Sequence, residues 1–152
     1  MAMRLIAALL LFAAFALPAG DAGFYAWTAS DLKGFSKSLA PKIDAHKVAT
    51  QQLGAVGNYS FMVAHREGSG EAEWHENQAD IFFVQTGGGT LTYGGSLVEG
   101  KTTQPHEMRA PSISGGMERK IAAGDVLTIP AKMPHQLKVD KEITYFVVKV
   151  TQ

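Results

Sequence analysis

The sequence contains no cysteine among its 152 residues. Disulfides, thiolate metal sites and cysteine nucleophiles are therefore excluded, and the folded chain must be held together by its core. The charge is balanced, with 14 basic against 14 acidic residues, and the sequence has no stripe of lysine and arginine. No nucleic acid is therefore expected as a partner. A Gly-x-Ser-x-Gly nucleophile elbow is missing as well, which leaves catalysis by a Ser/His/Asp arrangement without support.

The N-terminal residues 1–20 have the pattern of a secretory signal peptide. Arg4 supplies the positive charge, an apolar run extends from Leu5 to Leu17, and small residues follow at Ala19 and Gly20. The pattern predicts removal of this segment and a secreted or periplasmic protein. The alternative is a retained membrane anchor, which is disfavoured because a span needs roughly 20 apolar residues. No stable membrane insertion is expected after cleavage.

Residues 21–45 are expected to form an N-terminal extension with one short helix. Thr28 or Ser30 could cap this helix, and Asp31 suits its first turn. Its apolar face would consist of Leu32, Phe35 and Leu39. Pro41 is expected to end it.

From residue 46 onwards the pattern changes to short strands divided by glycine-rich turns, which predicts an all-β domain over 46–152. We expect strands at 46–53, 58–66, 71–75, 80–86, 89–93, 126–130, 135–139 and 143–150. The run Gly87-Gly88-Gly89 predicts a hairpin turn, since no helix follows to make a phosphate cradle. The less regular segment 95–120 is expected to be a long excursion with one or two short strands.

The strand predicted at 135–139 should direct His135 into the core. Side chains alternate along a strand, so His135 shares a face with Leu137 and Val139. Gln136 and Lys138 then point the other way. A buried imidazole needs partners for its nitrogens. A metal ion is one solution, and a hydrogen bond to a carboxylate or a backbone carbonyl is the other.

The strand predicted at 71–75 places Glu71, Glu73 and His75 on one face and Trp74 on the other. If the first face lines a barrel, two carboxylates and an imidazole share a space of low dielectric constant. Unpaired carboxylates are costly there, and a bound cation would satisfy them. The alternative is that Trp74 enters the core while the other face meets water.

Asp80 opens the next predicted strand, on the same face as Phe82 and Val84, so its carboxylate could also turn inward. The alternative is that Asp80 caps the turn at Asn77-Gln78. Asn77 would be a weak oxygen donor and is more typical of a turn.

Three further histidines occur in the sequence. His65 shares a strand face with apolar residues and is expected to be a hydrogen-bonded core residue near the site. His46 and His106 lie in polar or loop contexts, so they are expected to be exposed.

The segment from Gly124 to His135 resembles the second motif of the cupin superfamily, Gly-x5-Pro-x-Gly-x2-His-x3-Asn. It matches at Gly124, Pro130 and His135. It departs at Lys132, where the family has glycine, and at Val139, where the family has asparagine.

The segment upstream resembles the first cupin motif, Gly-x5-His-x-His-x(3,4)-Glu-x6-Gly. His75 takes the place of the second histidine, and Asp80 followed by Gly87 takes the place of glutamate and glycine. Glu73 replaces the first histidine. The resemblance therefore covers the region from Gly70 to His135.

This resemblance implies an antiparallel jelly-roll barrel with one divalent transition metal among its inward side chains. The implied ligands are His75, Asp80, His135 and Glu73. Such a mixed nitrogen and oxygen set suits iron, manganese or zinc. If Glu73 faces outward, a triad of two histidines and Asp80 remains. If Asp80 also turns away, the barrel is a metal-free binder.

The sequence thus predicts an exported single-domain cupin that binds a divalent metal and acts on a small molecule, with dioxygenase or isomerase chemistry as the enzymatic form. The alternative is a barrel that holds a small ligand or a metal without turning it over. A structural or partner-binding role is the third reading. The resemblance also implies a homodimer.

Overall fold

The computed structural model describes residues 23–152, so the predicted signal peptide lies outside the described residues. The elements are α1 (Ala29–Leu39), η1 (Ala40–Lys42), β1 (Val48–Val56), β2 (Tyr59–Arg66), β3 (Ala72–His75), β4 (Gln78–Tyr93), β5 (Ser96–Val98), β6 (Lys101–Gln104), β7 (Glu107–Ala110), β8 (Ser112–Ser114), β9 (Met117–Ala122), β10 (Val126–Ile129), β11 (His135–Lys138) and β12 (Ile143–Thr151). In this part of the chain, no helix has both the length and the apolar character that a membrane crossing requires.

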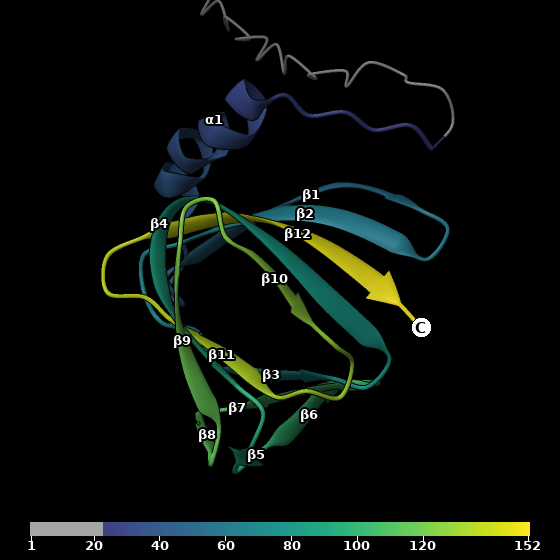
Figure 1. The fold of residues 1–152 in the computed structure, drawn as a ribbon, viewed down its shortest axis with the longest axis vertical. Coiled ribbons are helices and arrows are strands. Elements are labelled where there is room, and N and C mark those ends of the chain that lie inside the picture. Colours follow the sequence, from purple (N-terminus) through teal and green to yellow (C-terminus); the bar gives the residue numbers. More distant parts are fainter. Residues whose placement is uncertain (1–22) are drawn as a thin grey trace, which may run out of the picture.

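The strands form a curled antiparallel sheet with two facing layers (Figure 1). One layer contains β1, β2, β12, the first half of β4, and β10. The other contains β11, β3, β7, β6, β9 and the second half of β4. Because β4 belongs to both layers, it closes one side of the barrel. The predicted antiparallel all-β fold is confirmed.

The continuity of β4 overturns the predicted hairpin at Gly87-Gly88-Gly89. These residues lie inside the strand, where it passes from one layer to the other. A Cβ atom at Gly87 would lie 2.1 Å from the carbonyl oxygen of Glu142, and one at Gly89 would lie 2.4 Å from that of Lys138. The glycines therefore allow close packing of neighbouring backbones, and they do not reverse the chain.

The segment 95–120 also differs from its prediction. It contains five short strands, β5 to β9, and not one or two. Three of them (β6, β7 and β9) extend the second layer, and β5 pairs with β8 in a separate two-stranded sheet. Their residues are mostly exposed and polar, which is why no apolar alternation announces them in the sequence.

The helix α1 begins after Thr28, as predicted. The Thr28 side chain accepts a hydrogen bond from the backbone nitrogen of Asp31, and Asp31 Oδ2 accepts one from the backbone nitrogen of Thr28, 2.8 Å away. This reciprocal capping box satisfies two amide groups that the helix cannot pair. The helix ends at Leu39, and the following turn contains Pro41.

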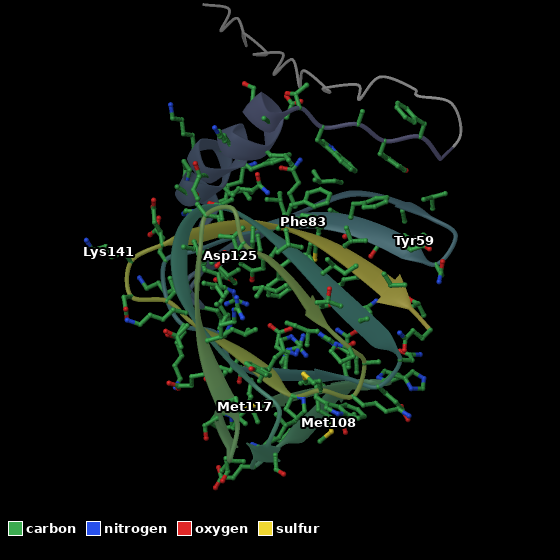
Figure 2. All side chains as sticks on the ribbon, in the orientation of Figure 1. Tyr59, Phe83, Met108, Met117, Asp125 and Lys141 are labelled. Atoms are coloured by element: carbon green, nitrogen blue, oxygen red, sulfur yellow. The ribbon has the colours of Figure 1, made fainter. Side chains whose placement is uncertain are left out.

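The helix covers the outer face of the first layer, on the side where Phe83 projects (Figure 2). Leu39 is fully buried there beside Val63 and Phe146. The barrel interior has its own apolar cluster, which includes Phe82, Val84, Leu91, Leu137, Val139 and Ile143. Alternate residues of the same strands pack into one cluster or the other, because successive side chains point to opposite faces of a strand. The same alternation directs the site residues into the barrel.

Candidate metal centre

Two buried histidines meet between neighbouring strands of the second layer. His75 ends β3 and His135 begins β11, and the two strands pair through His135 and Glu73. The side chains of His75 and His135 are 4% and 5% exposed. Their ring centroids are 5.4 Å apart. The alternation of His135 with Leu137 and Val139 is confirmed, since all three are buried.

Each imidazole is held by a hydrogen bond to its Nδ1 atom. His75 Nδ1 lies 2.6 Å from Glu107 Oε2, and His135 Nδ1 lies 3.1 Å from the carbonyl oxygen of Met133. Both partners are acceptors, so in the neutral rings the proton sits on Nδ1 and the lone pair on Nε2. Both Nε2 atoms are buried without a hydrogen-bond partner among the described residues. This is the arrangement in which an imidazole presents Nε2 to a metal.

Two carboxylates converge on the same point. Asp80 Oδ2 lies 3.4 Å from His75 Nε2 and 3.8 Å from His135 Nε2. Glu73 Oε2 lies 3.7 Å from His75 Nε2, and ligand atoms of Glu73, His75 and His135 all lie within 4.8 Å of one another. Donors about 2.1 Å from a tetrahedral cation are separated by about 3.4 Å. Glu73, His75 and His135 therefore form a compact group that could hold a cation, and Asp80 lies beside both of its imidazoles.

The burial of His75 contradicts the alternative in which its strand face meets water. Glu73 is 24% exposed and faces the cavity, while Trp74 lies on the opposite side and donates from Nε1 to the carbonyl oxygen of Lys132, 3.0 Å away. Glu71, in contrast, is exposed and takes no part in the site. Asp80 is 3% exposed in its side chain, so it points inward and does not cap the preceding turn.

Basic side chains hold both carboxylates. Lys149 Nζ donates to both oxygens of Asp80, at 2.8 and 3.0 Å. Glu73 lies between two arginines, with Oε1 3.5 Å from Arg66 Nη2 and Oε2 3.3 Å from Arg109 Nη2. The carboxylates are thus paired with cations of the protein itself.

These contacts shift the ionisation of the site. Burial by itself would raise the pKa of Asp80, but His75 and Lys149 outweigh it and lower that pKa to about 2. Burial opposes the charge on His75, yet the Asp80 and Glu107 carboxylates raise its pKa overall. Burial dominates at His135 and lowers its pKa. The pKa of Glu73 is lowered by Arg109 and the other nearby cations despite its burial.

The connection before β11 joins the two histidines through the backbone. The amide of Lys132 donates to the carbonyl oxygen of His75, at 2.7 Å. Lys132 has a φ of 65°, in the left-handed region that favours glycine. This explains why glycine suits the corresponding place in the cupin motif, and it shows that lysine still takes up the required conformation.

The remaining histidines lie apart from the site. His65 is 1% exposed, and its Nδ1 atom is 2.8 Å from Thr144 Oγ1. Its neighbours Ala64 and Arg66 line the cavity, so His65 points to the other face of β2. The prediction of a hydrogen-bonded core residue is confirmed, and its nearness to the site is wrong. His46 and His106 are exposed, as predicted.

The site opens into a cavity of about 360 Å³ inside the barrel. The residues of this lining that contact the candidate ligands or one another, and that were not identified from the sequence, include Arg66, Glu107, Arg109, Tyr145 and Lys149. Arg66 and Lys149 lie near strand ends, where charged residues are ordinarily solvated, and Glu107 belongs to the irregular segment. Lys149 shares one face of β12 with Tyr145 and Val147, and this spacing was the one signal in the sequence that could have identified it as an inward residue.

No family model and no curated protein sequence matches the chain. Solved structures do match. A protein from Thermotoga maritima described as a predicted oxalate decarboxylase is 16% identical over 69% of this chain and 81% of its own, with a TM-score of 0.51. An oxalate oxidase in complex with glycolate is 18% identical over 71% of this chain, with a TM-score of 0.51. The match spans about half of that oxidase, at 53% of its length.

A cupin-2 domain from Rhodospirillum rubrum is 16% identical over 70% of this chain and 62% of its own, with a TM-score of 0.50. Likeness at this level of identity concerns the fold, and the fold agrees with the two motifs in the sequence. The protein has the cupin fold, a curled antiparallel β-barrel with one short N-terminal helix. The fold that the motif resemblance implied is therefore confirmed.

Proposed function

We propose that the barrel binds one divalent transition metal through His75, His135, Asp80 and Glu73, and acts there on a small organic molecule. The observation that supports this most strongly is the pair of buried Nε2 atoms, neither of which has a hydrogen-bond partner among the described residues. Leaving two such atoms unsatisfied is costly, and a cation between them would satisfy both.

The donor set favours iron, manganese or zinc, because imidazole and carboxylate ligands suit these ions. When bound, the ion would supply a Lewis acid with open positions toward the cavity. The chain's own contribution is to hold the ligands in place, through Glu107 and the Met133 carbonyl, and to keep the site dry with Phe82 and Val147.

For the reaction, we propose dioxygenase or isomerase chemistry on a small organic molecule. Support comes from the size of the cavity, about 360 Å³, which suits a ligand of a few carbon atoms. The matched oxalate oxidase holds glycolate, a molecule of that size.

A second candidate is a metal-free barrel that holds a small ligand without turning it over. The observation in its favour is that Lys149 already pairs with Asp80, and that Arg66 and Arg109 already contact Glu73. The carboxylates are therefore compensated without a cation. In such a barrel, only the Nε2 atoms of His75 and His135 would still need a hydrogen-bond partner from a bound ligand.

Elemental analysis of the purified protein decides between these candidates. We expect about one transition metal per chain, lost in both His75→Ala and His135→Ala. His106→Ala is the matched control, because His106 is exposed and pairs with Glu76 away from the cavity. Absence of metal in the native protein after incubation with iron, manganese and zinc would favour the metal-free barrel. Loss in only one of the two variants would contradict a shared site.

We further propose that the chain is exported and that residues 1–20 are removed. The support is the Arg4 and Leu5 to Leu17 pattern of the sequence. Expression with the native N-terminus in a bacterial host, followed by mass spectrometry of the exported protein, would test this. A mature chain that retains residues 1–20 would contradict the proposal.

A further inference from the structure

Arg66 brings unused hydrogen-bond donors into the barrel. It ends β2, and its side chain is 13% exposed. Its Nε atom donates to the Tyr145 hydroxyl at 3.0 Å, while Nη2 lies 3.5 Å from Glu73 Oε1 in an ion pair without an aligned hydrogen bond. Within residues 23–152, the one hydrogen bond that Arg66 makes through its side chain is that of Nε, and neither terminal nitrogen makes one. Both nitrogens keep some solvent exposure, so water in the cavity can accept from them, and a ligand with acceptor oxygens could replace that water.

The other cations of the cavity are more fully engaged. Lys149 donates to both oxygens of Asp80. Arg109 Nη1 donates to Glu107 Oε2 at 3.1 Å and to the carbonyl oxygen of Met108 at 3.0 Å. Arg66 is therefore the cation of this cavity with the greatest capacity for an additional acceptor.

Two neighbours of Arg66 extend this capacity. The Tyr145 hydroxyl accepts from Arg66, so its own proton is available, and burial raises the pKa of Tyr145, which keeps that proton in place. A Cβ atom at Gly70 would lie 2.7 Å from Arg66 Nη1, although the backbone of Gly70 is not left-handed. Gly70 thus makes room for the guanidinium.

The charge of the cavity favours an anion. Its ionised lining residues balance, with Arg66, Arg109 and Lys149 against Glu73, Asp80 and Glu107. A divalent cation beside neutral histidines would leave two uncompensated positive charges in a largely buried space. Burying net charge is costly, so an anionic ligand would stabilise the loaded site.

We infer that Arg66 and Tyr145 form a carboxylate subsite, which holds one end of a small organic acid while its other end reaches the metal position. The inference rests on the proposed function and names its ligand class. The Glu73 carboxylate contacts both places, with Oε1 3.5 Å from Arg66 Nη2 and Oε2 3.7 Å from His75 Nε2. A dicarboxylate as short as malonate therefore matches the span.

Calorimetric titration of malonate into zinc-loaded protein tests the subsite. We expect saturable binding that Arg66→Gln weakens by at least about 10-fold, because charge-assisted hydrogen bonds are lost. Arg66→Lys should retain part of the affinity, since lysine keeps the positive charge but not the planar group that donates two hydrogen bonds to one carboxylate. Tyr145→Phe should weaken malonate binding several-fold. If the Arg66 variants do not fold, this variant tests the subsite in their place. Arg119→Gln, at an exposed residue of β9, is the matched control and should bind like wild type.

Three results would overturn the subsite: wild-type affinity in both Arg66→Gln and Tyr145→Phe, equal binding of the uncharged malonamide, or no binding of malonate at all. Zinc content is measured on the same samples, so failure of the metal site is seen separately. If the wild type takes up no zinc, the titration is made with metal-free protein. Binding that depends on Arg66 would then still support the subsite, and its absence would overturn it.

Discussion

His75 and His135 stand on adjacent strands with their ring centroids 5.4 Å apart, and each presents a buried, unpartnered Nε2 atom to the same space. Their Nδ1 atoms face different acceptors, a carboxylate at His75 and a backbone carbonyl at His135. The two ring planes are tilted by 53°, and the two pKa values shift in opposite directions, because nearby carboxylates stabilise a proton on His75 and burial opposes one on His135.

Glu107 orients His75, and its removal should weaken metal binding. The hydrogen bond between Glu107 Oε2 and His75 Nδ1 is 2.6 Å long. We expect Glu107→Gln to lower the zinc affinity by about 10- to 100-fold, as is usual for groups that hold a ligating histidine. Competition with a chromogenic chelator measures this. The control is Glu118→Gln at an exposed residue, and equal affinity in the two variants would contradict the orienting role.

Lys149 competes with a metal for Asp80, so Lys149→Met should have opposite effects in the two forms of the protein. In metal-free protein the buried Asp80 loses its lysine partner, which should lower the free energy of unfolding by about 3 kcal/mol. Zinc should restore that loss, because Asp80 is then free to bind it, and the zinc affinity should rise about 10-fold.

Denaturant unfolding with and without zinc measures both effects of Lys149→Met. Lys138→Met is the matched control, since Lys138 pairs with Glu118 on the surface and should leave the free energy of unfolding almost unchanged. A loss of stability in Lys149→Met that zinc does not restore would contradict the competition.

Zinc binding should release protons near pH 6.5, and they should come mainly from His75. The pKa of His75 is raised above its ordinary value of 6.5, so this imidazole is mostly protonated there, whereas His135, with a lowered pKa, is already neutral. A ligating imidazole must be deprotonated, so the zinc affinity should increase with pH until the raised pKa of His75 is passed.

The free energy of unfolding of the metal-free protein should change with pH in the opposite direction to the zinc affinity, and should fall as the pH rises. A raised histidine pKa contributes stability that is fully present below the unfolded value and is lost as the pH rises through the folded pKa. Calorimetry in buffers of different ionisation enthalpy measures the released protons. Zinc affinity that does not change between about pH 6 and 8 would contradict this account of His75.

Gly87 is needed for close packing, so Gly87→Ala should destabilise the barrel. Its φ is 69°, and a Cβ atom would lie 2.1 Å from the carbonyl oxygen of Glu142. We expect a loss of about 3 kcal/mol or more, from strain in both backbones. Gly57→Ala is the control, because its φ is 56° but nothing lies within 4 Å of the added atom, and about 1 kcal/mol is expected there. Thermal unfolding compares them, and equal losses would contradict a packing role.

The four candidate ligands could be identified from the sequence because each obeys a local rule. His135 alternates with Leu137 and Val139, and Asp80 alternates with Phe82, so their inward direction follows from strand geometry alone. The two cupin motifs then gave the pairing of the two segments. Export and the homodimer stay predictions.

The glycine run misled the sequence prediction for a physical reason. Glycine serves tight turns and close backbone contacts equally well, and only the positions of Glu142 and Lys138 show which of the two applies at Gly87 and Gly89. Sequence spacing carries no information about such contacts between strands.

By itself, the sequence determined the all-β fold, the capped helix and the inward direction of the four candidate ligands, because periodicity, capping and motif spacing act over a few residues. The tertiary structure alone decided the surroundings of those ligands. Glu107 reaches His75, and Lys149 reaches Asp80, through the register of strands that are distant in the chain. Whether a buried carboxylate faces a lysine, an arginine or an imidazole depends on that register, and the charge balance of the site follows from it.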